Sequence, residues 1–215
     1  MAAISRMFPE SARLTFSFYL FPFNFLGPFA SLTLPCRSAY NAPVEPESLK
    51  ICKYGEEVLK ARAAEVRDID QRILDLAAAM ARTMHQAPGI GLAAPQVGES
   101  LRLITVDLSV GEDPGELLIV INPRVVESEG HETSEEGCLS VPGYSLPIKR
   151  SARLLLLGTL PDGRELRAEF DGLKARVLQH EIDHLDGVTI VDRVSTLKRS
   201  LIRKEISQKR KSGEW

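Results

Sequence analysis

The chain has 215 residues, of which 44% are hydrophobic and 26% are charged, so it can bury a sizeable core and is expected to form one domain. Its formal net charge of −2 argues against a general nucleic-acid-binding protein. The three cysteines, Cys36, Cys52 and Cys138, are an odd number at wide spacing. They argue against a disulfide framework and favour a reducing compartment.

Residues 1–44 differ in composition from the rest of the chain. Seven of the eight phenylalanines lie between residues 8 and 29, and no charged residue occurs between Arg13 and Arg37. We expect a disordered or misassigned extension, with a targeting segment as the second interpretation because acidic residues are scarce. A membrane anchor is the third, since two prolines, a glycine and an asparagine interrupt the apolar run.

The working domain is expected at residues 45–195, followed by a basic helix or tail at residues 196–215. Its expected location is the cytoplasm, or an organelle matrix or stroma if residues 1–44 are a transit peptide. No membrane partner is expected.

The first predicted helix covers residues 70–86. Apolar residues recur there at three- and four-residue spacing, namely Ile73, Leu76, Ala77, Met80 and Met84. Asp70 is suited to cap the amino end of this helix, and Pro88 and Gly89 stop it.

Strand-like runs follow a segment of small residues. They lie at residues 101–108, 117–121, 154–160 and 165–170. The last two runs are joined by Pro161, Asp162 and Gly163, which is a strong signal for a hairpin. Strands joined by short turns, without helical crossovers, predict antiparallel sheets and an α+β fold.

A second helix is predicted at residues 171–187, and its helical wheel has three sides. One stripe contains Leu173, Val177, His180 and His184, and a second contains Leu178, Ile182 and Leu185. The third side, which we expect to face solvent, contains Gln179, Asp183 and Asp186. A helix with two apolar stripes is expected to be wedged into a core. We therefore expect antiparallel sheets packed around this central buried helix, with a further helix at the carboxyl end of the chain.

Residues 180–184 of this helix read HEIDH. Histidines four apart lie about 40° apart around a helix, so both imidazoles can bind one metal ion with Glu181 beside it. Chance occurrence on a surface helix is the weaker interpretation. The pentapeptide alone fits a metallopeptidase equally well, and spacing cannot choose a third ligand. The available donors are Cys36, Cys52, Cys138, His85, His131 and many carboxylates.

Three segments together resemble the signature motifs of the peptide deformylases. They are residues 89–96 (GIGLAAPQ), 136–140 (EGCLS) and 179–185 (QHEIDHL), in that order. The resemblance extends over residues 49–198 and also includes Val58-Leu59 and Asn122-Pro123. It leaves residues 1–44 without a counterpart.

The resemblance implies a role for each residue of the site. Cys138, His180 and His184 are the implied ligands of one divalent metal ion. The family commonly uses Fe²⁺, although Zn²⁺, Ni²⁺ or Co²⁺ can occupy the same donors. Glu181 is the implied general base and then acid, and the Leu139 N–H and the Gln96 amide are the implied donors to the formyl oxygen. For Gln96, stabilisation of a turn remains the alternative.

The implied substrate is the N-formylmethionine of a nascent polypeptide, which is released as formate and a free amino terminus. The residues expected to bind it are Gly89, Ile90, Gly91, Leu92 and Val177, the apolar ones by lining a pocket for the methionine side chain. The two glycines let a peptide backbone approach closely, as an added strand would. Glu136 is expected either to fix the neighbouring loop or to face solvent.

Two other classes of protein compete with this assignment. A metallopeptidase is disfavoured because its usual third ligand is another His or Glu, and a non-catalytic metal-binding or ribosome-binding protein is disfavoured by Glu181. Residues 196–215 carry seven Lys or Arg and two Glu. A solvated basic helix is the plain interpretation of this segment, and contact with ribosomal RNA is the functional one.

Overall fold

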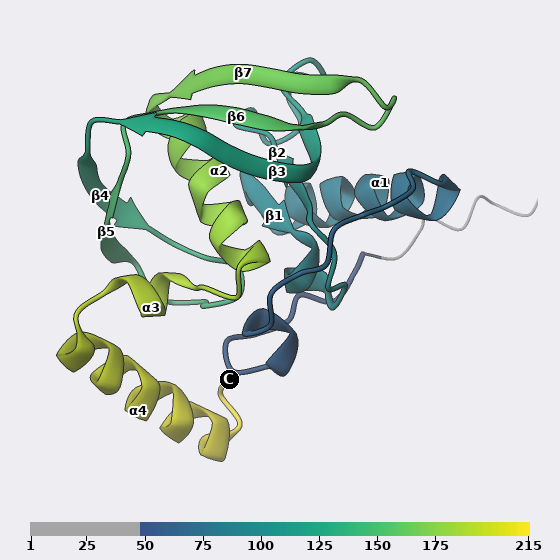
Figure 1. Cartoon of the computed structure of the whole chain (residues 1–215). Coiled ribbons are helices and arrows are strands. Elements are labelled where there is room, and N and C mark those ends of the chain that lie inside the picture. Colours follow the sequence, from purple (N-terminus) through teal and green to yellow (C-terminus); the bar gives the residue numbers. More distant parts are fainter. Residues whose placement is uncertain (1–47) are drawn as a thin grey trace, which may run out of the picture. The chain divides into compact units, whose positions relative to one another are not determined.

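The structure is a computed structural model that describes residues 48–215, so the expectations for residues 1–44 lie outside the described part (Figure 1). The helices are the short 3-10 segments η1 (Glu57–Leu59) and η2 (Ala94–Val97) and the α-helices α1 (Gln71–Gln86), α2 (Gly172–Leu185), α3 (Ile190–Arg193) and α4 (Thr196–Ser212). The strands are β1 (Gly91–Ala93), β2 (Leu103–Val106), β3 (Leu118–Glu129), β4 (Glu132–Glu136), β5 (Leu146–Arg150), β6 (Arg153–Thr159) and β7 (Glu165–Asp171).

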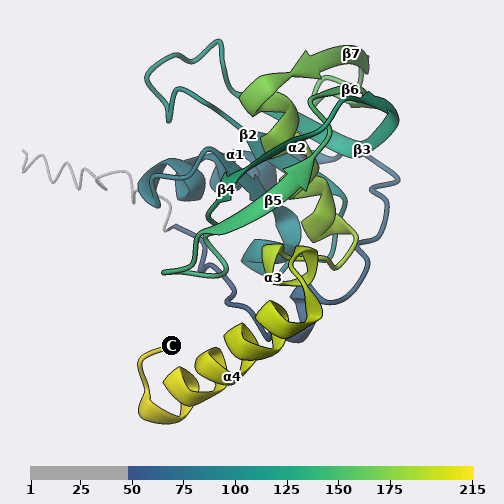
Figure 2. The same cartoon turned by 90° about the vertical axis from the view of Figure 1, so that its left-hand side faces the viewer.

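The strands form two antiparallel sheets. One has five strands in the order β1-β2-β3-β6-β7, and the other is the pair β4-β5. Figures 1 and 2 show α2 between these sheets and α4 at the carboxyl end of the chain. Apolar side chains of α2 (Ala175, Val177, Leu178 and Leu185) join the core against the larger sheet. The predicted α+β fold of antiparallel sheets with a C-terminal helix is confirmed.

Helix α1 forms where the apolar spacing predicts it. The Asp70 carboxylate accepts a hydrogen bond from the Ile73 N–H at 3.0 Å, which satisfies an N–H group that the helix cannot bond itself. Ile73, Ala77, Met80 and Met84 are buried in the core. The amphipathic pattern therefore reports the packed face of α1 correctly.

The β6–β7 hairpin also follows its sequence signal. Leu160 and Arg164 close the turn with an N–H to O bond of 2.9 Å, and Gly163 adopts a left-handed conformation with φ 84°. Seven residue pairs align across the two strands, from Arg153 opposite Asp171 to Thr159 opposite Glu165. The predicted hairpin is confirmed.

The prediction that a strand ends at Ile121 is wrong, because β3 continues to Glu129. Its register against β6 shifts between Ile121 and Arg124, so the strand passes Pro123 through an irregularity instead of stopping. Asn122 has φ 51° at this point, and its side-chain amide bonds both the N–H and the carbonyl of Val66, at 2.9 and 2.8 Å. A tertiary contact therefore stabilises the bulge.

The sequence patterns predict neither β1 nor the two-stranded sheet β4-β5. Strand β4 (ETSEE) is polar and exposed at four of its five positions, so it has no apolar alternation. Strand β1 has only three residues. Both depend on pairing with a partner strand, which a local pattern does not reveal.

Helix α2 lies within the predicted range, but the burial of two of its residues differs from what the helical wheel predicts. Leu173 is 54% exposed, because it lies in the first turn at the end of the helix. Asp183, expected on the wet side, is only 8% exposed and forms ion pairs with Arg150 and Arg193. Charged partners from elsewhere in the chain therefore cover Asp183.

Within residues 48–215, no helix combines the length and the apolar character that crossing a membrane requires.

Candidate metal centre

Three potential metal ligands meet beside α2. Cys138 lies in the loop between β4 and β5, and His180 and His184 lie on successive turns of α2. Their donor atoms all lie within 4.8 Å of one another, and Cys138 Sγ is 3.2 Å from His184 Nε2. The structure therefore brings together residues that are more than 40 positions apart in sequence.

This donor set fits a divalent metal ion. Burial alone would raise the pKa of the Cys138 thiol, but the charge of His184 and hydrogen bonds from both histidines hold that pKa well below its ordinary value. The thiolate that a metal ion needs is thus favoured. A thiolate with two imidazoles leaves room for a fourth ligand at a tetrahedral site.

Glu136 contacts the nitrogen of His180 that faces away from the other two ligands. His180 Nδ1 lies 3.0 Å from the Glu136 carboxylate, which leaves His180 Nε2 to face the other ligands. Arg150 and Arg176 donate hydrogen bonds to the same carboxylate at 2.6–2.8 Å. Burial would raise the pKa of Glu136, but the bonds from His180 and Arg150 lower it to about 2. The expectation that Glu136 faces solvent is wrong, because the residue is 7% exposed, and its bonds reach side chains of β5 and α2 instead of the neighbouring loop.

A second carboxylate extends this network. Arg150 also donates to Asp183 at 2.7 Å, and Arg193, the last residue of the short helix α3, donates to Asp183 as well. Arg150 thereby links the end of β4, two residues before Cys138, to the helix that carries both histidines. Its side chain is 3% exposed, so water screens these charges only weakly.

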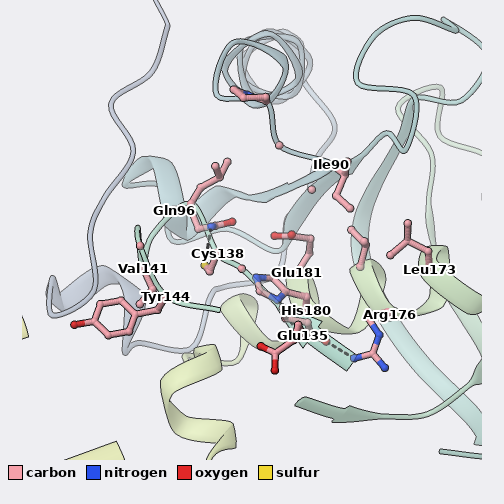
Figure 3. Close-up of a pocket in the computed structure, with 18 residues that line it drawn as sticks. Ile90, Gln96, Glu135, Cys138, Val141, Tyr144, Leu173, Arg176, His180 and Glu181 are labelled. Carbon is pink, nitrogen blue, oxygen red and sulfur yellow. Dashed lines mark hydrogen bonds and ion pairs between the residues drawn. The ribbon is translucent and has the colours of Figure 1, made fainter. Parts of the chain in front are cut away.

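Glu181 points toward the ligands from α2 and is 3% exposed (Figure 3). Its Oε2 atom is buried without a hydrogen-bond partner among the described residues. Burial raises the pKa of Glu181 to about 7, although the charges of His180 and His184 oppose the rise. A Cβ atom on Gly91 would collide with Glu181 and Val177, so only glycine leaves space at that point.

Gln96 faces the ligand loop from η2. Its side-chain oxygen accepts a hydrogen bond from the Ala93 N–H at 2.8 Å, which directs the Nε2 donor toward Ser140 Oγ at 3.2 Å and Cys138 Sγ at 3.7 Å. The residue is 1% exposed. Gln96 both stabilises its own turn and offers an N–H donor to the site.

These groups line one pocket of about 400 Å³, a volume in the range of small-ligand sites. The sequence-predicted residues that line it are Gly89, Ile90, Gly91, Gln96, Cys138, Leu139, Val177, His180 and Glu181. Leu92 lies elsewhere, contrary to expectation: it is fully buried in the core, because alternate residues of β1 face opposite ways. His184 is also buried behind the lining, at 1% exposure.

A model of the polypeptide deformylase family matches residues 48–200. The chain belongs to this family. Peptide deformylases remove the N-formyl group from nascent polypeptide chains, and the function expected from the three sequence motifs is therefore confirmed at the level of the family. The match leaves residues 1–47 and 201–215 outside the family model.

Individual deformylases agree with the family match. The peptide deformylase of Thermodesulfovibrio yellowstonii is 48% identical over 162 residues, which cover 75% of this chain and 98% of the relative. The crystal structure of a peptide deformylase from Legionella pneumophila has a TM-score of 0.72 at 36% identity and covers 78% of this chain and 98% of its own. A Synechococcus elongatus deformylase in complex with actinonin has a TM-score of 0.70 at 38% identity, covering 74% and 88%.

Among the residues that line the pocket of this deformylase fold and that sequence reasoning did not assign to the site are Glu135, Tyr144 and Arg176. Tyr144 lies beyond the Cys138 motif, and no pattern in the sequence marks it. Arg176 lies one helical turn before His180, and this spacing is the one signal that could have placed it on the same side of α2.

Proposed function

We propose that the chain is a metal-dependent hydrolase that removes the formyl group from the N-terminal methionine of newly synthesised proteins. The observation that supports this most strongly is the meeting of one thiol, two imidazoles and a buried carboxylate at a pocket, in a chain of the deformylase family. The proposed site of action is the cytoplasm, or an organelle matrix or stroma if residues 1–44 direct the chain there. Residues 45–195 are the proposed catalytic domain.

Cys138, His180 and His184 are the proposed ligands of one divalent ion, with Fe²⁺ as the proposed metal and Zn²⁺, Ni²⁺ or Co²⁺ as alternatives. When bound, such an ion lowers the pKa of a water molecule and polarises a carbonyl group. Glu136 supports this assignment, because its contact with His180 Nδ1 fixes the orientation of that imidazole.

Glu181 is the proposed proton carrier. Its unpartnered Oε2 atom accepts the proton of the attacking water and later delivers it to the leaving amine. A carboxyl pKa near 7 suits both steps, because the group gains and loses a proton readily at neutral pH. The attack on the formyl carbon forms a C–O bond, and the C–N bond to the methionine nitrogen then breaks.

Negative charge develops on the formyl oxygen during the attack. We assign its stabilisation to the Gln96 side-chain N–H and the Leu139 backbone N–H. The bond between Gln96 and Ala93 supports this role, because it fixes the amide before the substrate arrives. To donate to the formyl oxygen, the Gln96 Nε2 group exchanges one of its present contacts, with Ser140 Oγ or Cys138 Sγ.

The methionine side chain is proposed to lie against Ile90 and Val177. Strand β1 is the edge of the five-stranded sheet, so its outer side can pair with the substrate backbone. Gly89 and Gly91 allow the close approach that such pairing needs, and Leu92 takes part only through its backbone.

The direct test is formate release from formyl-Met-Ala-Ser by protein prepared anaerobically, with metal analysis of the same sample. Anaerobic handling protects a thiolate-ligated centre from oxidation. Formate in stoichiometric amounts with Met-Ala-Ser is the expected result. Cleavage of a peptide bond without formate release would replace the proposal with the metallopeptidase alternative, and acetyl-Met-Ala-Ser is the control substrate.

A second proposal concerns α4 as a contact to the ribosome. Leu197 and Leu201 on α4 are 74% and 60% exposed, the two most exposed large apolar side chains of the described part. Four of the seven basic residues contact this chain itself: Arg199, Arg203, Lys209 and Arg210. Lys198, Lys204 and Lys211 make no ion pair within residues 48–215 and are available for RNA phosphates.

A further inference from the structure

The chain that follows α4 returns to the rim of the pocket. Helix α4 ends at Ser212, and Gly213 turns the backbone with φ 80°, a left-handed conformation that favours glycine. Trp215 then packs against Tyr144, with the ring centroids 6.2 Å apart and the ring planes at 63°. Because Tyr144 lines the pocket, Trp215 lies directly behind a residue of the pocket wall.

The contact between the two rings depends on packing. The Trp215 indole nitrogen is buried without a hydrogen-bond partner among residues 48–215, whereas burial and the neighbouring Glu205 raise the pKa of the Tyr144 hydroxyl. The Lys209 ammonium lies 5.0 Å from the centre of the Tyr144 ring, and the Lys53 ammonium lies 6.0 Å from that of Trp215. Each ring thus meets the other and one cation, an arrangement that stabilises both.

The loop that carries Tyr144 is held at Ser140 by hydrogen bonds from Tyr54 and Gln96, and its next residues form an exposed turn. Pro142 and Gly143 are exposed, and a Cβ on Gly143 would meet no atom within 4 Å. Val141 at the start of this turn is fully buried with Ile202 and Ile206 of α4. The C-terminal segment therefore contacts both ends of this turn, Val141 through α4 and Tyr144 through Trp215.

Tyr144 and the apolar part of the pocket lie apart. Figure 3 shows Tyr144 and Val141 on one side of Cys138, with Ile90 and Leu173 on the opposite side. On the proposed function, the methionine side chain takes the Ile90 side. The wall at Tyr144 is then left for the part of the polypeptide that follows the methionine.

We propose that Trp215 is a positioning residue that holds Tyr144 in the pocket wall and so strengthens the binding of formylated peptides that extend beyond their first two residues. The inference rests on the proposed function but concerns substrate length, which the metal ligands and Glu181 do not determine. Trp215 itself takes no part in the chemical step.

The test compares Trp215→Leu with wild type on formyl-Met-Ala and on formyl-Met-Ala-Ser-Lys. In Trp215→Leu we expect KM for the tetrapeptide to rise about three- to tenfold, the loss that one aromatic pair supports, with kcat unchanged. KM for the dipeptide stays at the wild-type value. Trp215→Phe should keep the wild-type KM for the tetrapeptide, because a phenyl ring still packs on Tyr144 and Trp215 has no hydrogen bond to lose.

The matched control is Leu201→Ala, a large apolar residue of the same segment that is 60% exposed and does not line the pocket. It should leave both KM values unchanged. Metal content is measured in every variant, because equal content shows that the loop carrying Cys138 is intact.

Fluorescence gives a second readout, since Trp215 is the single tryptophan of the chain. The product peptide Met-Ala-Ser-Lys should change the emission of wild type, and Tyr144→Leu should abolish that change. A peptide-induced change that persists in Tyr144→Leu would contradict the inference.

The kinetic outcomes separate this inference from the proposed function. If wild type releases formate and Trp215→Leu shows unchanged KM values, or an equal rise for both substrates, the inference alone is wrong. If wild type releases no formate, the proposed function fails and the inference fails with it.

Discussion

Helices α2 and α4 both carry many charged residues, but they use them in opposite ways. Helix α2 buries Arg176, Glu181 and Asp183 together with both histidines of the candidate metal centre. Helix α4 buries only Ile202 and Ile206 among its 17 residues and leaves most of its charges in water.

The difference lies in the partners of those charges. A buried charge is stable only when other groups pair with it and satisfy its hydrogen bonds, and the carboxylate of Asp183 in α2 has Arg150 and Arg193. Exposed charges are solvated and need no partner. Substitutions of the buried charges around α2 should therefore change both the free energy of unfolding and the rate of formate release. Substitutions on the exposed side of α4 should change neither.

The largest expected effect on folding comes from Arg150→Met. This change leaves Glu136 and Asp183 without their shared partner, and breaking such a buried pair costs about 3–5 kcal/mol in the free energy of unfolding. Urea denaturation measures it. The control is Arg153→Met, whose ion pair with Glu129 is exposed, and it should cost at most about 1 kcal/mol. Equal losses in the two variants would remove the contrast between buried and exposed charges.

A smaller effect is expected from pH. The pKa of Glu136 falls from 4.5 to about 2 on folding, so its ionised form stabilises the folded state. That contribution is complete above pH 4.5 and is lost as the pH falls toward 2. The free energy of unfolding, measured across this window, should fall less steeply in Glu136→Gln than in wild type. An identical slope would show that Glu136 is not the group responsible.

The smallest effect on the fold is expected from the double variant Lys204→Glu with Lys211→Glu on α4. Its free energy of unfolding should change by no more than about 0.5 kcal/mol, as is usual for surface substitutions. Binding to ribosomes, measured by cosedimentation at low salt, should weaken, and added salt should reduce the difference. Lys60→Glu with Lys149→Glu has the same net charge and is the control. Equal weakening in both variants would mean that net charge, and not α4, governs binding.

Local signals in the sequence predict the elements that form by themselves. Helix α1 follows from its apolar spacing and from the Asp70 cap, and the β6–β7 hairpin follows from the turn at residues 161–163. The grouping of Cys138 with the two histidines came from resemblance to a family, because spacing alone offered several possible third ligands.

Contacts between distant residues explain what the sequence did not predict. Asp183 was expected in water because its partners, Arg150 and Arg193, lie on other elements. The β4–β5 pair has no apolar alternation in β4, and the packing of Trp215 on Tyr144 joins the last residue of the chain to a loop far earlier. Periodicity describes one element at a time, so it does not report such pairings.

The central claim is that Cys138, His180 and His184 hold a metal ion while the neighbouring Glu181 moves the proton. Metal content and formate release, measured on the same samples of wild type, Glu181→Gln and Cys138→Ala, test it most directly. Glu181→Gln should keep its metal and lose activity by at least about a hundredfold, and Cys138→Ala should lose both. Full activity in Glu181→Gln, or unchanged metal in Cys138→Ala, would contradict this division of roles.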